Sequence, residues 1–158
     1  MSSDLTFSVA DVAGFDRRGR RHAGRRKRLA DLFGKLPAMR AQALLEEVGA
    51  EVENQTRRRL SEEKRAPDGE AWDEWSDAYA ATRPPKGGLL ELDGHLIDSI
   101  TYNVNTDTVS VGSNLVYAGV HQYGHGGVPA RPYLGQSAEN TRELTELVLD
   151  WIEKEMGK

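Results

Sequence analysis

Cysteine is absent from this sequence, and so are long apolar runs. The first absence excludes disulfides, thiolate metal sites and a cysteine nucleophile, and it fits a protein kept in a reducing compartment. No apolar run approaches the length that crosses a bilayer. The N-terminus, MSSDLTFSVADVAG, lacks the basic start and apolar centre of a signal peptide. We therefore expect a soluble intracellular protein with no membrane contact.

Catalytic motifs are also absent. The sequence has no phosphate-binding Gly/Lys/Ser loop, no dinucleotide fingerprint, no Gly-x-Ser-x-Gly elbow and no HExxH. His121 and His125 are four residues apart, but Gly124 disfavours a shared helix and no third ligand lies nearby. We predict no catalytic residue, no metal site and no cofactor, so the protein is not expected to be an enzyme. A hydrolase using His121 with a carboxylate partner is the rival without a supporting motif.

Acidic residues are missing from one stretch, Arg17 to Arg28, although the whole chain has a net charge of −4. The rest of the chain carries 13 basic and 25 acidic residues. Glycines disfavour a helix here, so we expect a flexible basic loop at about residues 14–30. It could contact nucleic acid or an acidic partner without sequence preference. The eight basic residues are Arg17, Arg18, Arg20, Arg21, Arg25, Arg26, Lys27 and Arg28.

Periodicity predicts the main elements of the first half. Alternation over Leu5 to Val12 indicates a short strand. A long helix is predicted from Pro37 to near Glu63, with Glu53 able to pair with Arg57 one turn later. Its buried stripe is expected to be Ala41, Leu44, Leu45, Val48, Val52 and Leu60.

The second half contains shorter elements. A short helix is expected up to Ala81, and residues 89–100 are a second helical candidate with Leu92, Leu96, Ile97 and Ile100 spaced for burial. Residues 100–104 and 109–112 read as a hairpin around a turn at 105–107. Ser137 can cap a last helix that runs to about Met156. Its buried face is expected to be Leu144, Leu147, Val148, Trp151 and Ile152.

The order of these elements predicts the fold class. Strands and helices are segregated rather than alternating, which favours an α+β fold. We expect a small antiparallel sheet, made of the N-terminal strand and the hairpin, packed by the long helix and the C-terminal helix. Residues 1–158 are expected to form one domain.

Acidic residues cluster beside two tryptophans. Glu70, Asp73, Glu74 and Asp77 lack the ligand pattern of a calcium loop. A solvated face is the favoured interpretation.

The stretch YAGVHQYGHGGVPARPYLG, residues 117–135, has no strand or helix periodicity after its opening. A short helical turn should begin at Tyr117, bury Val120 and stop at Gly124. Pro129 and Pro132 should fix the backbone around an outward or carboxylate-bound arginine. Such a rigid loop is typical of a protein interface, and internal packing of the same residues is the equal alternative. The candidate interface residues are Tyr117, His121, Gln122, Tyr123, Arg131 and Tyr133.

Four blocks in order resemble the phage virion morphogenesis family of tail completion proteins, found in Mu-like and related tailed phages. They are PDGEAW (67–72), LLELDGHLIDSI (89–100), VGSNLVYAGVHQYG (111–124) and VPARPYLG (128–135). The basic stretch departs from the family pattern because it is longer and more basic.

The resemblance implies a non-enzymatic assembly protein that completes the tail or neck and enables head-tail joining. Such a protein would form a ring with copies of itself, expected to be hexameric, and would contact the tail tube or terminator and the head-tail connector. It would be found in the virion, and in the host cytoplasm during assembly. The basic loop would reach an acidic neighbour or packaged DNA in the lumen. The alternative is a small nucleic-acid-binding protein that acts through residues 17–28.

Overall fold

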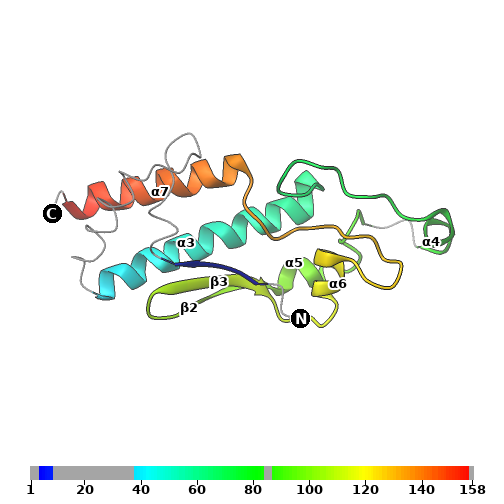
Figure 1. Ribbon diagram of the computed structural model, residues 1–158, viewed down its shortest axis with the longest axis horizontal. Coiled ribbons are helices and arrows are strands. Elements are labelled where there is room, and N and C mark those ends of the chain that lie inside the picture. The colour runs from blue at the N-terminus through cyan, green and yellow to red at the C-terminus, as the bar shows by residue number, and fades with distance from the viewer. Residues whose placement is uncertain (1–3, 9–37, 84–86, 157–158) are drawn as a thin grey trace.

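The structure is a computed structural model that describes residues 4–8, 38–83 and 87–156. Figure 1 shows the elements along the chain. They are β1 (Asp4–Ser8), α3 (Ala38–Arg58), the π-helical turn η1 (Arg59–Glu63), α4 (Asp77–Thr82), α5 (His95–Ser99), β2 (Ile100–Val104), β3 (Thr108–Ser113), α6 (Ala118–Tyr123) and α7 (Ala138–Met156).

The sheet is antiparallel, with the strand order β1-β3-β2. The predicted hairpin is therefore confirmed as β2 and β3, and the predicted N-terminal strand is confirmed over residues 4–8. Its expected continuation to Val12 lies outside the described residues. Alternation along β3 places Val109 and Val111 in the core, where both are fully buried. Val111 pairs with Leu5 on one side and with Tyr102 on the other.

The long helix α3 is confirmed, and η1 continues it to Glu63. α3 packs on β2 and β3 and also contacts α7, so in Figure 1 it lies between the hairpin and α7. Its stripe of Leu44, Leu45, Val48 and Val52 is buried, as expected. The predicted pair of Glu53 and Arg57 forms with a separation of 3.0 Å.

The C-terminal helix α7 begins at its predicted cap. The Ser137 hydroxyl oxygen accepts a hydrogen bond from the Asn140 amide at 3.0 Å, which satisfies one of the free donors of the first turn. Leu144, Val148 and Trp151 are buried against the core. The predicted apolar face is thus confirmed for these three residues, while Leu147 and Ile152 are partly buried.

The helix predicted for residues 89–100 is wrong over its first half. Only residues 95–99 are helical, because the backbone enters the left-handed region at Leu90 (φ 60°) and at Gly94 (φ 77°). A helix cannot continue through such residues. Leu92 was expected to be buried but is 52% exposed, whereas Leu96 is buried as predicted.

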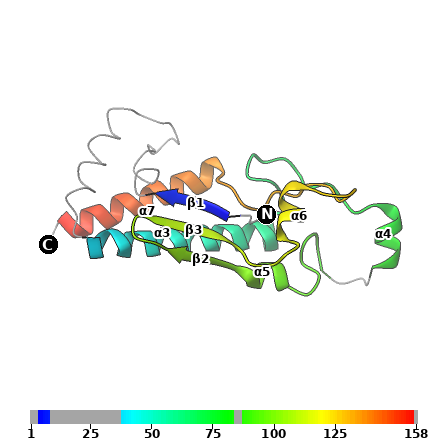
Figure 2. The same cartoon turned by 60° about the horizontal axis from the view of Figure 1, so that its bottom comes forward.

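The fold is α+β, as the sequence predicts. The sheet, α3 and α7 form what we call the body of the molecule, and α4 lies at the end opposite the C-terminus (Figures 1 and 2). No helix in the described ranges combines the length and the apolar character that crossing a membrane requires.

Candidate protein interface

The candidate interface is built on α6 and on the irregular segment 124–137, which we call the pinned loop. The predicted helical turn is confirmed, and it ends at Gly124, where φ is 75°. The buried residue of this turn is Ala118, whereas Val120, which was expected to be buried, is half-buried. The first residue of α6 is therefore the one packed in the core, and the last residues of α6 lie at the surface.

Side-chain donors hold the backbone of the pinned loop. The Trp72 indole N–H donates to the Pro132 carbonyl at 2.9 Å. Arg59 Nη1 donates to the carbonyls of Tyr133 at 2.9 Å and Gly135 at 3.0 Å. Residues 132–135 belong to no strand or helix, so side chains bind their carbonyl groups in place of a backbone ladder. The irregular path of the loop is thereby fixed.

Gln122 joins α6 to the pinned loop. Its side-chain oxygen accepts hydrogen bonds from the amides of Tyr133 and Leu134, each at 3.0 Å. Its side-chain nitrogen donates to the Leu134 carbonyl, also at 3.0 Å. The Arg131 amide adds a bond to the His121 carbonyl at 2.7 Å. The helical turn and the loop therefore behave as one rigid unit.

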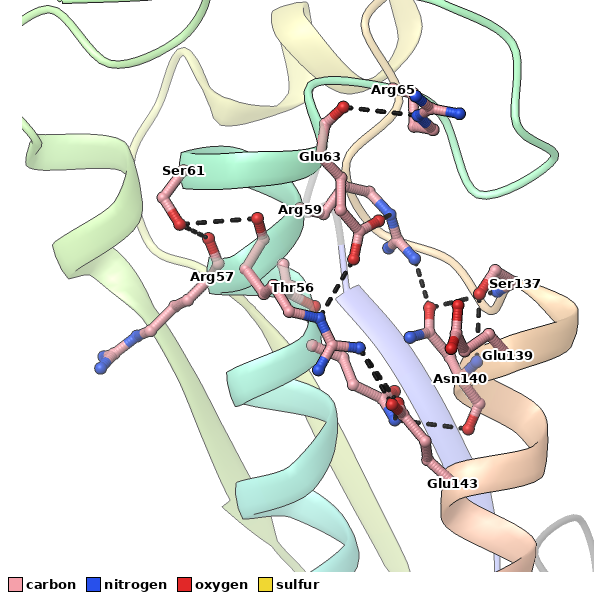
Figure 3. Close-up of polar contacts among 12 residues, drawn as sticks. Thr56, Arg57, Arg59, Ser61, Glu63, Arg65, Ser137, Glu139, Asn140 and Glu143 are labelled. Carbon is pink, nitrogen blue, oxygen red and sulfur yellow. Dashed lines mark hydrogen bonds and ion pairs between the residues drawn. The ribbon is translucent and has the colours of Figure 1, made fainter.

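Arg59 connects this unit to the body. Figure 3 shows its guanidinium between Glu63 and Asn140, whose side-chain oxygen accepts a hydrogen bond from Nη2. The Glu63 carboxylate lies 3.8 Å from Nε. Burial lowers the pKa of Arg59, and the charge of Glu63 opposes that effect. The fully buried cation is thus held mainly by carbonyl and amide oxygens from the loop and α7.

Arg131 does not occupy the position expected from the sequence. It is buried, and it donates from Nε to the Asp73 carbonyl at 2.8 Å and from Nη2 to the Glu74 carbonyl at 3.1 Å. It therefore points neither outward nor toward a carboxylate, because the backbone of residues 73–74 supplies the oxygens. Tyr133 is fully buried as well. For Gln122, Arg131 and Tyr133, internal packing accounts for the contacts observed.

Three other candidate residues reach the surface. Tyr123 is 58% and Tyr117 is 42% exposed. His121 is half-buried, and its ring meets Tyr117 edge to face at a centroid distance of 5.8 Å. Burial lowers the pKa of His121, and the nearby charge of Arg131 lowers it further. His125 is an exposed loop residue beyond the end of α6, so the two imidazoles share no helical face.

A groove of about 780 Å³ opens beside this face. Its opposite wall comes from residues 73–76 and 90–96 and from Tyr79 on α4. Trp75 and Tyr79 meet edge to face at 6.3 Å, and the Arg83 guanidinium lies 3.8 Å from the centre of the Trp75 ring. Tyr79 and Leu92 are about half exposed, at 50% and 52%. The groove is therefore lined by accessible apolar and aromatic surface.

The sequence predicted neither the groove nor the side chains that bind the backbone of the pinned loop, which are those of Arg59, Trp72 and Gln122. Arg59 lies seven residues after Val52 on the buried stripe of the long helix, so its position could have indicated a buried cation. Nothing local in the sequence pairs Gln122 with residues 133–134. The acidic cluster of residues 70–77 is exposed, as predicted. The eight basic residues 17–28 lie outside the described residues.

Across the described residues, no group of three or more His, Asp or Glu side chains could hold a metal ion. The site is a rigid, partly aromatic surface beside a groove. Such surfaces are typical of proteins that bind other proteins.

Comparison with known proteins names the family. Residues 25–153 match the sequence model of the phage virion morphogenesis family, so the chain belongs to this family. It is 35% identical over 92 residues to the putative capsid assembly protein G of Escherichia phage Mu. That alignment covers 51% of this chain and 59% of the length of the relative. No solved structure matches the chain. The predicted membership of the phage virion morphogenesis family is confirmed, and it supports a structural or assembly role in phage.

Proposed function

We propose that this protein completes the phage tail or neck and enables the tail to join the head, without catalysing a reaction. The observation that carries the proposal is that the family match includes both α6 and the whole pinned loop. A fixed loop shape is useful to a protein that docks on a partner of fixed shape, since little conformational entropy is lost on binding.

The exposed aromatic residues support a docking role. Tyr117 and Tyr123 stand on a turn whose backbone is held by Gln122 and the pinned loop. Tyrosine supplies a large contact area with few rotatable bonds, and it is enriched in protein interfaces. In this proposal Tyr117, His121 and Tyr123 contact the partner directly. Gln122, Arg131 and Tyr133 keep that surface in shape.

The proposed assembly is a ring of identical subunits, expected to be hexameric, in the neck or at the head-proximal end of the tail. Its partners are other copies of the chain, the tail tube or terminator, and the head-tail connector. A closed ring uses two different patches on each subunit. The protein would pass from the host cytoplasm into the virion during assembly.

Electron microscopy of particles made without this protein tests the proposal. Filled heads lying apart from tails, which join when purified protein is added, are the expected result. Normal joined particles in the absence of the protein would overturn it.

A pair of variants then tests the docking face. Tyr123→Ala should retain the melting temperature of the wild type but join fewer heads to tails in the add-back assay, because the side chain is exposed. Tyr123→Phe keeps the ring and should restore most of the joining. Equal joining by all three proteins would remove Tyr123 from the contact.

The rival function is nucleic-acid binding through residues 17–28. Deleting them should abolish all function under the rival, whereas a neck protein should keep its fold and some of its assembly contacts. DNA binding that falls steeply with salt would favour the rival, because each cation would release counterions from DNA.

A further inference from the structure

The groove carries an excess of negative charge. One of its carboxylates, Glu91, is paired with Lys64 at 3.2 Å. Asp73, Glu74 and Asp93 are exposed, and no ion pair joins them to any residue in the described ranges. Arg131 also lies at the groove, where its Nε and Nη2 donate to the backbone carbonyls of Asp73 and Glu74. An incoming cationic segment would therefore meet unpaired carboxylates.

The groove already binds one guanidinium group. Arg83 lies over the face of Trp75 at 3.8 Å, which is within the range of a cation–π contact. The half-exposed rings of Tyr79 and Tyr117 offer further aromatic surface in the same groove. Arginine stacks on aromatic rings and pairs with carboxylates in a way that lysine does not reproduce. This combination of rings and acids suits an arginine-rich peptide.

We infer that the groove binds the arginine-rich segment, residues 17–28, of a second copy of this chain. That segment carries eight basic residues and no acid, seven of the eight being arginine. Its charge complements the four carboxylates of the groove, which outnumber the two guanidinium groups, Arg83 and Arg131, that also line it. A segment of the same protein is also present at equal concentration wherever the groove is present.

The placement of the two features favours a second copy over the same chain. β1 ends and α3 begins toward the end of the molecule where the C-terminus lies, whereas the groove is built on the end that carries α4 (Figures 1 and 2). α3 alone is 21 residues, or about 31 Å, long. Arg17 is nine residues after β1 and Arg28 is ten residues before α3. Fully extended, these connections span at most about 31 to 36 Å.

Binding within one chain would therefore require both connections to run toward the opposite end of the molecule at once, which costs conformational entropy. A second copy placed head to tail brings its segment to the groove without that extension. Contacts of this kind join two different patches, so they propagate into a ring or a chain of subunits. The inferred contact would join neighbouring subunits of the proposed ring. Only the closure of the contacts into a ring rests on the proposed function.

Self-association of the full chain tests the inference. Sedimentation equilibrium of the wild type at low ionic strength should show oligomers that dissociate as salt is added, because salt screens the contact. Asp73→Lys/Glu74→Lys should weaken association by about tenfold or more. Both side chains are exposed, so the variant should keep the wild-type circular dichroism spectrum. Glu46→Lys/Glu47→Lys, the same charge change on the exposed face of α3, should stay within about twofold of the wild type.

A charge exchange separates direct contact from an indirect effect. Replacing Arg20, Arg21, Arg25 and Arg26 by Glu should also weaken self-association. Combining these changes with Asp73→Lys/Glu74→Lys in one chain should restore self-association, because the reversed charges again match. Failure of this chain to associate would overturn the inference, since the two reversed patches would then not meet.

Two other outcomes also overturn it. One is a wild-type chain that stays monomeric at low salt, and the other is a groove variant that associates as the wild type does. If residues 17–28 bind DNA while the wild-type chain stays monomeric at low salt, the inference is overturned in the same way. The result is separable from the particle assay. Monomeric protein that still joins heads to tails defeats this inference alone, and normal particles without the protein defeat the proposed function alone.

Discussion

The body of the molecule and the pinned loop are stabilised in different ways. In the body, Val48 and Val52 of α3 pack against strand residues such as Val109 and Val111, and all four are fully buried. In the pinned loop, side-chain donors and acceptors bind consecutive backbone groups from Pro132 to Gly135. A regular sheet satisfies its own backbone, so its side chains are free to form an apolar core. An irregular loop needs polar side chains for the same purpose.

This difference explains why aromatic side chains are exposed at one end of the molecule. The residues that hold the pinned loop approach it from inside, from η1, from residue 72 and from α6. Its outer surface is consequently left free for contact. The comparison predicts that core substitutions reduce global stability. Substitutions of the side chains that bind the pinned loop should also disturb the shape of the candidate interface.

The largest loss of stability is expected from Trp151→Ala, in the body. Trp151 is buried on α7, so its removal leaves a cavity and should reduce the free energy of unfolding by roughly 3 kcal/mol or more. Urea denaturation followed by circular dichroism measures this. A change near zero would mean that this face of α7 is not part of the core.

Arg59→Met tests the connection between the two regions. The apolar replacement leaves the carbonyls of Tyr133 and Gly135 and the Asn140 side chain without their donor, and should cost roughly 3 kcal/mol. Amide hydrogen exchange should also increase in the pinned loop.

Arg58→Met is the matched control for that substitution. Arg58 is more exposed and binds Glu63 and Glu143 at 3.1 Å, so its loss should cost about 1 kcal/mol or less. Equal losses for the two variants would contradict the role given to Arg59.

Gly49→Ala tests the packing of α3 on the sheet. A methyl group there would lie 2.6 Å from Tyr102 Cδ2 and 2.8 Å from Val109 Cγ2. Although alanine favours a helix, we expect the free energy of unfolding to fall by about 1 to 3 kcal/mol. Thermal unfolding provides the measurement, and a variant more stable than the wild type would show that α3 can move away from the sheet.

The smallest effect is expected from the titration of His121. Its folded pKa is lowered by burial, so the unfolded state binds more protons and stability falls as the pH drops below about 6.5. NMR titration of the imidazole should give a value below that of an unfolded peptide, and His121→Asn should reduce the slope of stability against pH. An unchanged slope would contradict the assignment.

Much of the body could be predicted because its elements have regular periods. The stripe of α3, the hairpin and the Ser137 cap are local patterns, and each was found in its expected place. The helix over residues 89–94 failed because a glycine and a left-handed leucine interrupt an otherwise suitable apolar pattern.

The sequence by itself determined the α+β class, the main elements and the family, because these depend on periodicity and on short motifs that lie along the chain. Only the tertiary structure decided that Arg131 is buried, that Gln122 and Arg59 hold the pinned loop, and that residues 73–76 and 90–96 form the other wall of the groove. The partners in these contacts are separated by as many as 76 residues. No local pattern specifies which distant carbonyl a buried donor will find, because that choice follows from how α3, α6 and the loop pack together.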